Sequence, residues 1–309
     1  MSDRGGVRVR TSGGAGRRRP GYRGPVPSPL LPYAVRAALG VAVGDRLGRV
    51  QVVSRTGSTS TDLVEAATAD PQAWPDRSVL VADHQEQGRG RSGRTWQTPP
   101  GSALTASVLL RPPVPVDRFG WLPLLGGLAV VRALTTLGVR AVLKWPNDVL
   151  VAEADTRELL DWGRHRKVAG VLADLLPASP AGGDPAVVIG IGVNVGQSAE
   201  ELPVASATSL ALCGVVVDRT ELLAAVVASL LELDDRWRAA GGDAVGAGLA
   251  AEVAAACSTL GTPVRVSRPG GAVLLGRATG LSGDGALRVM DADGREHTIL
   301  AGDVEQVRA

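Results

Sequence analysis

Lysine is nearly absent from this chain. Only Lys144 and Lys167 stand among the 33 lysine and arginine residues of a 309-residue sequence. An ammonium is a compact point charge with three rotatable donors, whereas a guanidinium is a planar fork that keeps its proton. Two retained ammonium groups favour a tight site in which each meets one oxygen of a phosphate or carboxylate. The alternative is that a biased composition left two lysines by chance.

Cysteine is equally scarce, and long apolar runs are missing. Cys213 and Cys257 have no metal-ligand spacing and no local histidine partners, so we expect buried thiols of a cytoplasmic protein. No stretch approaches the roughly 18 uncharged apolar residues of a membrane span, and no apolar segment of the secretory type follows the basic N-terminus. A formal net charge of +2 also argues against a general polyanion binder.

The composition otherwise predicts a globular chain with three parts. Residues 1–29 carry seven arginines against one acid, Asp3, and are expected to form a disordered Arg/Gly/Pro-rich tail. For this tail, nucleic-acid contact, a solvated extension and a misplaced start codon are the alternatives. Residues 30–260 are predicted to form an α+β domain and residues 261–309 a small β-barrel.

Periodicity and turn signals place the expected elements. Strands are predicted at 48–54, 78–83, 102–111, 141–144, 149–151, 168–175 and 186–195. Helices are predicted at 61–70, with Ser60 or Thr61 as N-cap, and at 118–138, 219–239 and 244–260. Short strands at 262–268, 272–281, 286–291 and 295–301 follow, separated by hairpin signals.

The segment Gln85–Trp96 combines glycines with arginines. Its glycines match the G-x-G-x-x-G template of dinucleotide-binding folds, but Pro99 and Pro100 prevent the helix that would receive a pyrophosphate. Forked arginine donors in a glycine-rich loop instead suit carboxylate and phosphate oxygens. We therefore expect a loop that is mobile when empty and is ordered by an anion. A flexible basic surface loop is the alternative.

Two further strings place polar groups at strand ends. In Lys144-Trp-Pro-Asn-Asp148, Pro146 imposes an extended residue before it and a turn after it. Lys144, Asn147 and Asp148 should therefore point to one rim, although a plain turn pair is the alternative. Asn194 ends an apolar strand with two glycines, and a buried Asn must find partners in a ligand or in another strand.

Together these strings resemble the biotin protein ligase family. The resemblance rests on five strings in this order: Gly57-Ser-Thr-Ser60, Gln85 with Gly88–Trp96, Lys144–Asp148, Lys167-Val-Ala-Gly170 and Ile189–Asn194. It implies an α+β fold with a mixed-sheet catalytic domain of the biotin/lipoate protein ligase type and a small C-terminal SH3-like β-barrel. The implied activity is ATP-dependent attachment of biotin, through biotinyl-5′-AMP, to a lysine of a carrier domain.

The resemblance also implies a set of ligand-binding residues, with no protein ligand to a metal. They are Ser58, Thr59, Ser60, Gln85, Gly88, Arg89, Gly90, Arg91, Arg94, Trp96, Lys144, Asn147, Lys167, Gly170 and Asn194. Ser58, Thr59 and Gln85 resemble biotin-pocket residues, and Arg89, Gly90 and Arg91 resemble a biotin-ordered loop. Arg94, Trp96, Lys144, Asn147 and Asn194 resemble positions around the adenylate.

Four residues of the implied site carry the chemistry. Lys167 matches the family's lysine that contacts the carboxyl group of biotin. Arg91 and Lys144 are the other two cations of the implied site. Asp148 stands where the family is proposed to deprotonate the acceptor lysine. If the assignment is right, Arg91, Lys144 and Lys167 must share one cavity.

The implied ligands are ATP, biotin and Mg²⁺ carried with ATP, and the implied partner is the biotin carboxyl carrier domain of acyl-CoA carboxylases. No membrane contact is expected, and a homodimer is left open. The N-terminal region is too short and too rich in Gly and Pro for the winged helix-turn-helix of repressor members, so no specific DNA binding is expected. The 152–166 connection is longer than the family's usual hairpin and leaves a helical insertion open.

Three rival functions are open to this sequence. A lipoate-protein ligase or octanoyl transferase shares the fold, but the Gly-Arg-Gly-Arg loop argues against both. A biotin-sensing DNA repressor would have to use the basic tail. A purely structural role is disfavoured because so many polar motifs are predicted to converge on one cleft.

Overall fold

A seven-stranded mixed sheet forms the centre of the protein in a computed structural model. The model describes residues 28–152, 158–159, 162–178, 184–267, 271–300 and 302–306, so nearly all of the predicted tail lies outside the described residues. The strand order is β1-β2-β5-β9-β8-β7-β6; β1 and β2 pair in parallel and the other neighbours are antiparallel. The strands are β1 (Arg49–Thr56), β2 (Ser78–Gln85), β5 (Ala103–Leu110), β6 (Ala141–Lys144), β7 (Asp148–Ala152), β8 (His165–Leu176) and β9 (Ala186–Asn194).

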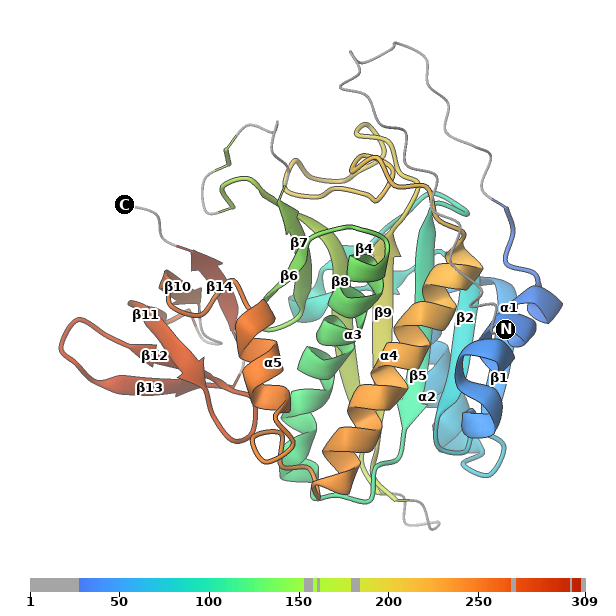
Figure 1. Ribbon diagram of the computed structural model, residues 1–309, viewed down its shortest axis with the longest axis horizontal. Coiled ribbons are helices and arrows are strands. Elements are labelled where there is room, and N and C mark those ends of the chain that lie inside the picture. The colour runs from blue at the N-terminus through green and yellow to red at the C-terminus, as the bar shows by residue number, and fades with distance from the viewer. Residues whose placement is uncertain are drawn as a thin grey trace, which may run out of the picture.

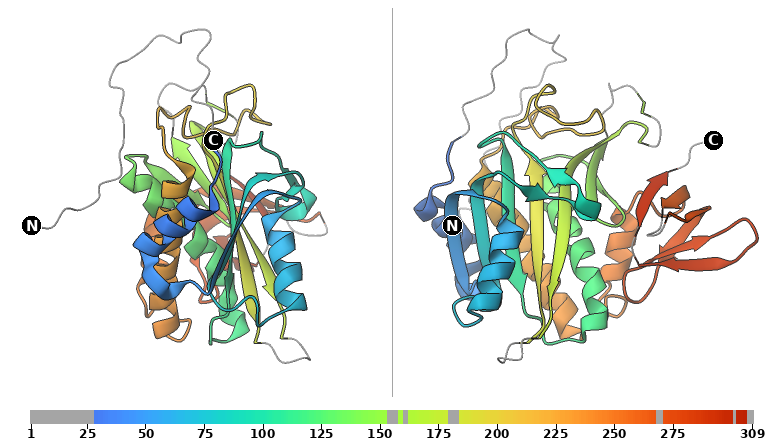
Figure 2. Two further views of the ribbon diagram at one scale, coloured as in Figure 1. Left: turned by 90° about the vertical axis from the view of Figure 1, so that its right-hand side faces the viewer. Right: turned by 180° about the vertical axis from the view of Figure 1, so that it is seen from behind.

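Helices cover both faces of this sheet. Helices α1 (Pro32–Val43), α3 (Leu122–Thr136) and α4 (Arg219–Ala239) lie on one face, and α2 (Thr59–Ala69) lies on the other (Figures 1 and 2). Because both faces are covered, every residue of the central strand β5 is buried. Short 3-10 turns stand at Gly44–Arg46, Arg91–Gly93 and Val116–Trp121.

The helix α3 is apolar almost all round. With the preceding turn it forms the one stretch of the described chain, Val116–Thr136, that is long and apolar enough to cross a membrane by length and composition. The most apolar segment of that stretch is 72% buried inside the protein. A helix that is hydrophobic on all sides is typical of a core position, and α3 packs against α4 and β8.

A five-stranded antiparallel sheet follows helix α5 (Leu249–Ala256). Its order is β13-β12-β11-β10-β14, with β10 (Pro263–Ser267), β11 (Val273–Leu281), β12 (Leu287–Met290), β13 (Glu296–Ile299) and β14 (Asp303–Gln306). Figure 1 shows it beside α5 at the β6 end of the central sheet. Two buried indoles fix it there: Trp121 Nε1 donates to the Gly283 carbonyl at 2.8 Å, and Trp145 Nε1 donates to the Gly285 carbonyl at 3.2 Å.

The structure corrects several predicted boundaries. Helix α2 begins at Thr59, and its N-cap is Ser58 rather than Ser60 or Thr61. The helix predicted at 244–260 is shorter, Leu249–Ala256, because Gly248 before it has φ +74°, in the left-handed region that a right-handed helix cannot use. Helix α1 and strand β14 were missed. Cys257 is buried as expected, but Cys213 is only half-buried.

The glycine-arginine segment is not a loop throughout, and its expected ordering by an anion stays a prediction. It contains a two-stranded ribbon of β3 (Gly88–Arg89) and β4 (Thr95–Trp96). No helix follows the ribbon among residues 95–101, as the two prolines predicted. The ribbon lies on the same side of the central sheet as α2 (Figure 2), and this position places the arginines over the sheet.

Candidate active site

One cavity of about 730 Å³ collects the predicted site residues. It lies between the ribbon, the ends of β6 to β9, the start of α2 and strand β14. Its lining includes Ser58, Thr59, Ser60, Gln85, Arg89, Gly90, Arg91, Arg94, Trp96, Lys144, Asn147, Asp148, Lys167, Gly170 and Asn194. Arg91, Lys144 and Lys167 therefore share a cavity, as the assignment required. Gly88 does not line it.

The start of helix α2 forms a buried polar pocket. The Thr59 backbone N–H and hydroxyl both donate to Gln85 Oε1, at 2.7 and 2.8 Å. The Ser107 hydroxyl donates to Thr59 Oγ1 at 2.8 Å and lies 3.0 Å from Ser60 Oγ. Ser58 Oγ caps the helix. Such a chain of bonded polar groups holds its members in fixed positions, which suits recognition of a small ligand with several polar atoms.

The Lys144–Asp148 string forms a tight hairpin between β6 and β7, in which these two residues face each other in register. Asn147 is tied to the neighbouring strand β8 through both its side chain and its backbone. Its Nδ2 donates to the Val171 carbonyl at 2.8 Å, and its carbonyl accepts from the Val171 N–H at 2.9 Å. Asn147 and Asp148 are therefore not only turn residues. The bonds of Asn147 hold the hairpin so that Lys144 and Asp148 lie at the cavity rim.

The lysines have different surroundings. Lys167 Nζ lies 2.6 Å from Asp148 Oδ1 and 5.5 Å from the centroid of the Trp96 ring. Lys144 is only 8% exposed, and its Nζ lies 4.0 Å from the centroid of the Trp162 ring. Burial lowers the pKa of Lys144, and the positive charge of Lys167 adds to this, while Asp148 opposes it.

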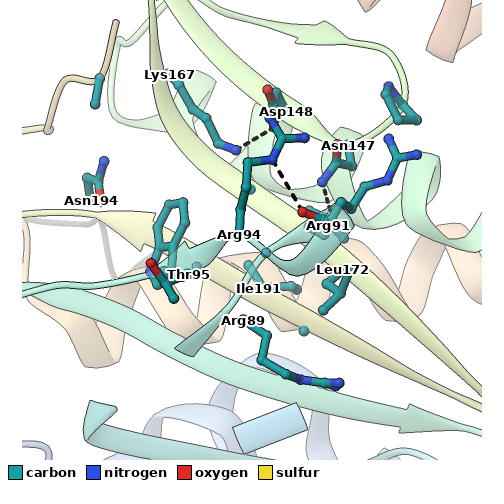
Figure 3. A pocket seen from close by; sticks show the side chains of 18 of the residues that line it. Arg89, Arg91, Arg94, Thr95, Asn147, Asp148, Lys167, Leu172, Ile191 and Asn194 are labelled. Atoms are coloured by element: carbon teal, nitrogen blue, oxygen red, sulfur yellow. Dashed lines mark hydrogen bonds and ion pairs between the residues drawn. The ribbon is translucent and has the colours of Figure 1, made fainter. Parts of the chain in front are cut away.

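The three loop arginines are all held in place by protein oxygen atoms. Arg89 Nη2 lies 2.7 Å from Asp174 Oδ2, and Arg94 Nη2 lies 2.6 Å from Asp303 Oδ1 of β14. Arg91 Nη1 donates to the Gly302 carbonyl at 3.4 Å, and burial lowers the pKa of its guanidinium. Figure 3 shows Arg89 directed away from Lys167 and Asp148. An arriving anion would compete with these oxygens for the guanidinium groups.

Glycines make room for Trp96 and Lys167 on the cavity floor. A Cβ on Gly192 would lie 2.7 Å from the Trp96 ring, and a Cβ on Gly170 would lie 3.2 Å from Lys167 Nζ. The Trp96 indole N–H is buried and has no hydrogen-bond partner among the described residues. Gly88 does not line the cavity but lets the two strands of the ribbon approach each other, since a Cβ there would lie 2.3 Å from the Trp96 carbonyl oxygen.

Asn194 is satisfied by the protein itself. Its Nδ2 donates to the Thr208 carbonyl at 2.9 Å, and its Oδ1 accepts from Gln197 Nε2 at 3.0 Å. The sequence offered a ligand or another strand as the partner of Asn194. In the structure both partner residues lie in the loop after β9. Asn194 still lines the cavity, so a ligand would meet an amide whose orientation is already fixed.

Sequence reasoning missed part of the wall. Asp303, Val304 and Glu305 of β14 line the cavity, as does Trp162 from the long 152–166 connection. No spacing in the sequence connects β14 with the ribbon, which lies some two hundred positions earlier. Part of the 152–166 connection lies outside the described residues, so the helical insertion left open there has no structural answer. Within the described chain, no three His, Cys, Asp or Glu side chains group as metal ligands.

The fold and the cavity define a class of protein. A mixed sheet carries a polar pocket at one helix start, two lysines and three arginines around a common cavity, and a small β domain that supplies one wall. This arrangement suits an enzyme that brings two negatively charged small molecules together.

Comparisons with known proteins agree with this class. Residues 52–194 match the Biotin/lipoate A/B protein ligase family, and residues 259–306 match the Biotin protein ligase C terminal domain. The chain is 36% identical to the Biotin--[acetyl-CoA-carboxylase] ligase of Mycobacterium tuberculosis, over 91% of this chain and 97% of that protein. It therefore belongs to the biotin protein ligase family.

Two other similarities extend the comparison. The Bifunctional ligase/repressor BirA of Bacillus subtilis is 32% identical over 60% of this chain and 52% of its own length. The solved structure of Biotin protein ligase from Aquifex aeolicus in complex with biotin and ATP has a TM-score of 0.63 and 28% identity, covering 85% of this chain and all of that one. The catalytic fold and the C-terminal sheet are thus those of the family.

Proposed function

We propose that this protein uses ATP to attach biotin to a lysine of a biotin carboxyl carrier domain, through biotinyl-5′-AMP. The observation that carries the proposal is the common cavity of Arg91, Lys144, Lys167 and Asp148 beside the polar pocket of α2. The name of the Mycobacterium tuberculosis relative, and the biotin and ATP bound in the Aquifex aeolicus structure, support the same activity.

In the first step, a biotin carboxylate oxygen attacks the α-phosphorus of ATP, and the bond to pyrophosphate breaks. Both reactants are anions, so their approach requires cations at fixed positions. Lys167 is proposed to bind the carboxylate, with Arg91 and Lys144 beside the phosphates. The polar pocket around Thr59 and Gln85 would hold the rest of biotin, so that the carboxylate points toward Lys167.

In the second step, the carrier lysine, as a neutral amine, attacks the carbonyl carbon of biotinyl-AMP. An amide bond forms, the bond to the phosphate oxygen breaks, and AMP leaves with the electron pair. The attacking nitrogen loses a proton, for which Asp148 at the cavity rim is the proposed acceptor. The glycine-arginine ribbon is proposed to close over the intermediate and keep water from the activated acyl group.

Magnesium is proposed to enter with the nucleotide. Among the described residues, no three His, Cys, Asp or Glu side chains group together. The protein by itself therefore does not offer this ion a set of side-chain ligands. Triphosphate oxygens are the usual ligands of Mg²⁺ in such sites, where the ion would neutralise phosphate charge.

The partner follows from the reaction. We propose that the carrier domain belongs to an acyl-CoA carboxylase, as the name of the Mycobacterium tuberculosis relative indicates, and that the protein acts in the cytoplasm, where ATP is available. We also propose that it does not bind DNA specifically. Assembly into a homodimer stays a prediction.

Three measurements test the proposal. Purified protein with biotin, ATP and Mg²⁺ but no carrier should release pyrophosphate and retain biotinyl-AMP; absence of both would overturn it. Calorimetry with biotin and with lipoate separates this ligase from lipoate-attaching relatives, and preference for lipoate would reject the biotin assignment. Addition of a carrier domain should then consume the intermediate and label one lysine.

A further inference from the structure

Both lysines of this chain face an indole ring. Lys167 Nζ lies 5.5 Å from the centroid of Trp96, and Lys144 Nζ lies 4.0 Å from the centroid of Trp162. The first pair belongs to strings that the family resemblance covers. The second does not, because Trp162 comes from the 152–166 connection, which is longer than the usual hairpin. Its contact with Lys144 is therefore not implied by the family resemblance.

The surroundings of Lys144 make this contact important. The side chain is almost fully buried, yet no ion pair or hydrogen bond to Nζ is found within the described ranges. A buried ammonium without a partner is costly. The face of an indole attracts a cation, most strongly when both groups are shielded from water. The Trp162 ring is thus a neutral group in contact with the ammonium, in addition to the carboxylates of Asp148, Glu305 and Asp303, whose charges raise the pKa of Lys144.

Hydrogen bonds hold the backbone on either side of Trp162. The Trp162 N–H donates to the Leu159 carbonyl at 3.1 Å, and its carbonyl accepts from the His165 N–H at 3.0 Å. The Gly163 carbonyl accepts from Arg166 Nη1 at 2.9 Å. The backbone that carries the ring is therefore tied to the start of β8, the strand that also carries Lys167.

We propose that Trp162 is a positioning residue that holds the Lys144 ammonium, charged and directed into the cavity, for the phosphates of the nucleotide. The proposal rests on the proposed function. The ring attracts the ammonium and, unlike a carboxylate, adds no negative charge that would repel a phosphate. Asp148 is engaged by Lys167, and an indole leaves Lys144 available to an incoming anion.

The test compares Trp162→Leu, Trp162→Phe and Lys144→Met in the full chain, with initial rates of pyrophosphate release. Trp162→Leu should raise the KM for ATP on the order of 10-fold, as expected for a shielded cation–π contact, with little change in the KM for biotin or in Tm. Trp162→Phe keeps an aromatic face and should recover most of the loss. Trp74→Phe is the control, because its ring lies 4.1 Å from Arg49 outside the cavity, and its KM for ATP should stay at the wild-type value.

The decisive measurement is the double variant. If the ring acts through the ammonium, Trp162→Leu should add little to the loss already caused by Lys144→Met. Full additivity would overturn the proposal, because it would mean that the ring contacts the nucleotide itself. An equal loss in the KM for biotin would overturn it as well. Failure of the wild type to release pyrophosphate would instead reject the proposed function; calorimetric binding of ATP to the wild type and to Trp162→Leu then tests the positioning role by itself.

Discussion

The ammonium of Lys167 and the carboxylate of Asp148 lie 2.6 Å apart. The proposed mechanism assigns them to different steps, since Lys167 binds the biotin carboxylate and Asp148 accepts a proton from the carrier lysine. In this ion pair each neutralises the other. We therefore expect biotin to displace Asp148 from Lys167, and the displaced carboxylate to become available for the second step.

Replacing Asp148 by Asn should separate the two steps. The amide removes the proton acceptor, and transfer of preformed biotinyl-AMP to the carrier should slow on the order of 100-fold. Pyrophosphate release should change by only a few fold, because Lys167 is retained. Single-turnover assays measure both rates, and Asp117→Asn, an exposed carboxylate outside the cavity, serves as control. Equal slowing of the two steps would contradict the assignment.

Replacing Lys167 by Arg tests the need for an ammonium. The guanidinium is larger and planar, and Gly170 shows how little space remains, since even a Cβ there would lie 3.2 Å from Nζ. Pyrophosphate release should fall on the order of 10- to 100-fold, comparable to loss of a preorganised donor. Arg36→Lys, an exchange between the same two residue types at an exposed position of helix α1, should have no effect. Wild-type turnover by the Lys167 variant would mean that charge alone suffices.

The floor of the cavity should not tolerate a methyl group under Trp96. Gly192→Ala puts a Cβ 2.7 Å from the indole ring, so the ring must move, and overpacking of this kind costs about 1–3 kcal/mol. Ligand affinity should fall with it. Gly196→Ala is the matched control four positions later, just after the end of β9, where the nearest atom would lie at an ordinary 3.8 Å. Calorimetry and Tm compare the two, and similar affinities would argue against a floor position for Trp96.

The contact between Arg94 and Asp303 should restrain the ribbon. Both side chains are largely exposed, so the pair contributes at most about 1 kcal/mol to stability, and Asp303→Asn should leave Tm nearly unchanged. The freed Arg94 should bind ATP a few fold more tightly, because the phosphates no longer compete with a carboxylate. Glu296→Gln in the same small sheet removes a 3.9 Å pair with Arg288 and controls for charge. Weaker ATP binding by Asp303→Asn would refute the competition.

The lowered pKa of Lys144 gives a pH dependence of known sign. Burial favours the neutral amine, whereas a bound anion favours the ammonium, so binding raises this pKa and takes up a proton at alkaline pH. Affinity for ATP should therefore be highest below the lowered pKa and fall as the pH rises through it. Calorimetry in two buffers of different ionisation heat detects the proton. Lys144→Met should lose this uptake, and an affinity that rises over the same range would contradict the assignment.

Local sequence determined the bounds of several helices and strands and most of the residues that line the cavity. Strand Ala141–Lys144 and helix Arg219–Ala239 have the predicted bounds, because a strand before Pro146 and a helix capped by Asp218 are specified by neighbours in the chain. The predicted ligand-binding residues, Gly88 excepted, also line one cavity. Their roles there stay predictions, since position does not establish chemistry.

Only the tertiary structure decided how distant segments complete the site. Trp145 was part of a recognised string, yet its bond to Gly285, which anchors the small sheet, joins residues 140 positions apart. The same holds for Asp303 beside Arg94 and for Trp162 beside Lys144. Periodicity and capping act over a few residues, whereas these contacts arise when apolar faces pack and bring the segments together. The sequence therefore specified the elements and the cationic groups, while packing of the small sheet and the long connection determined which groups face those cations.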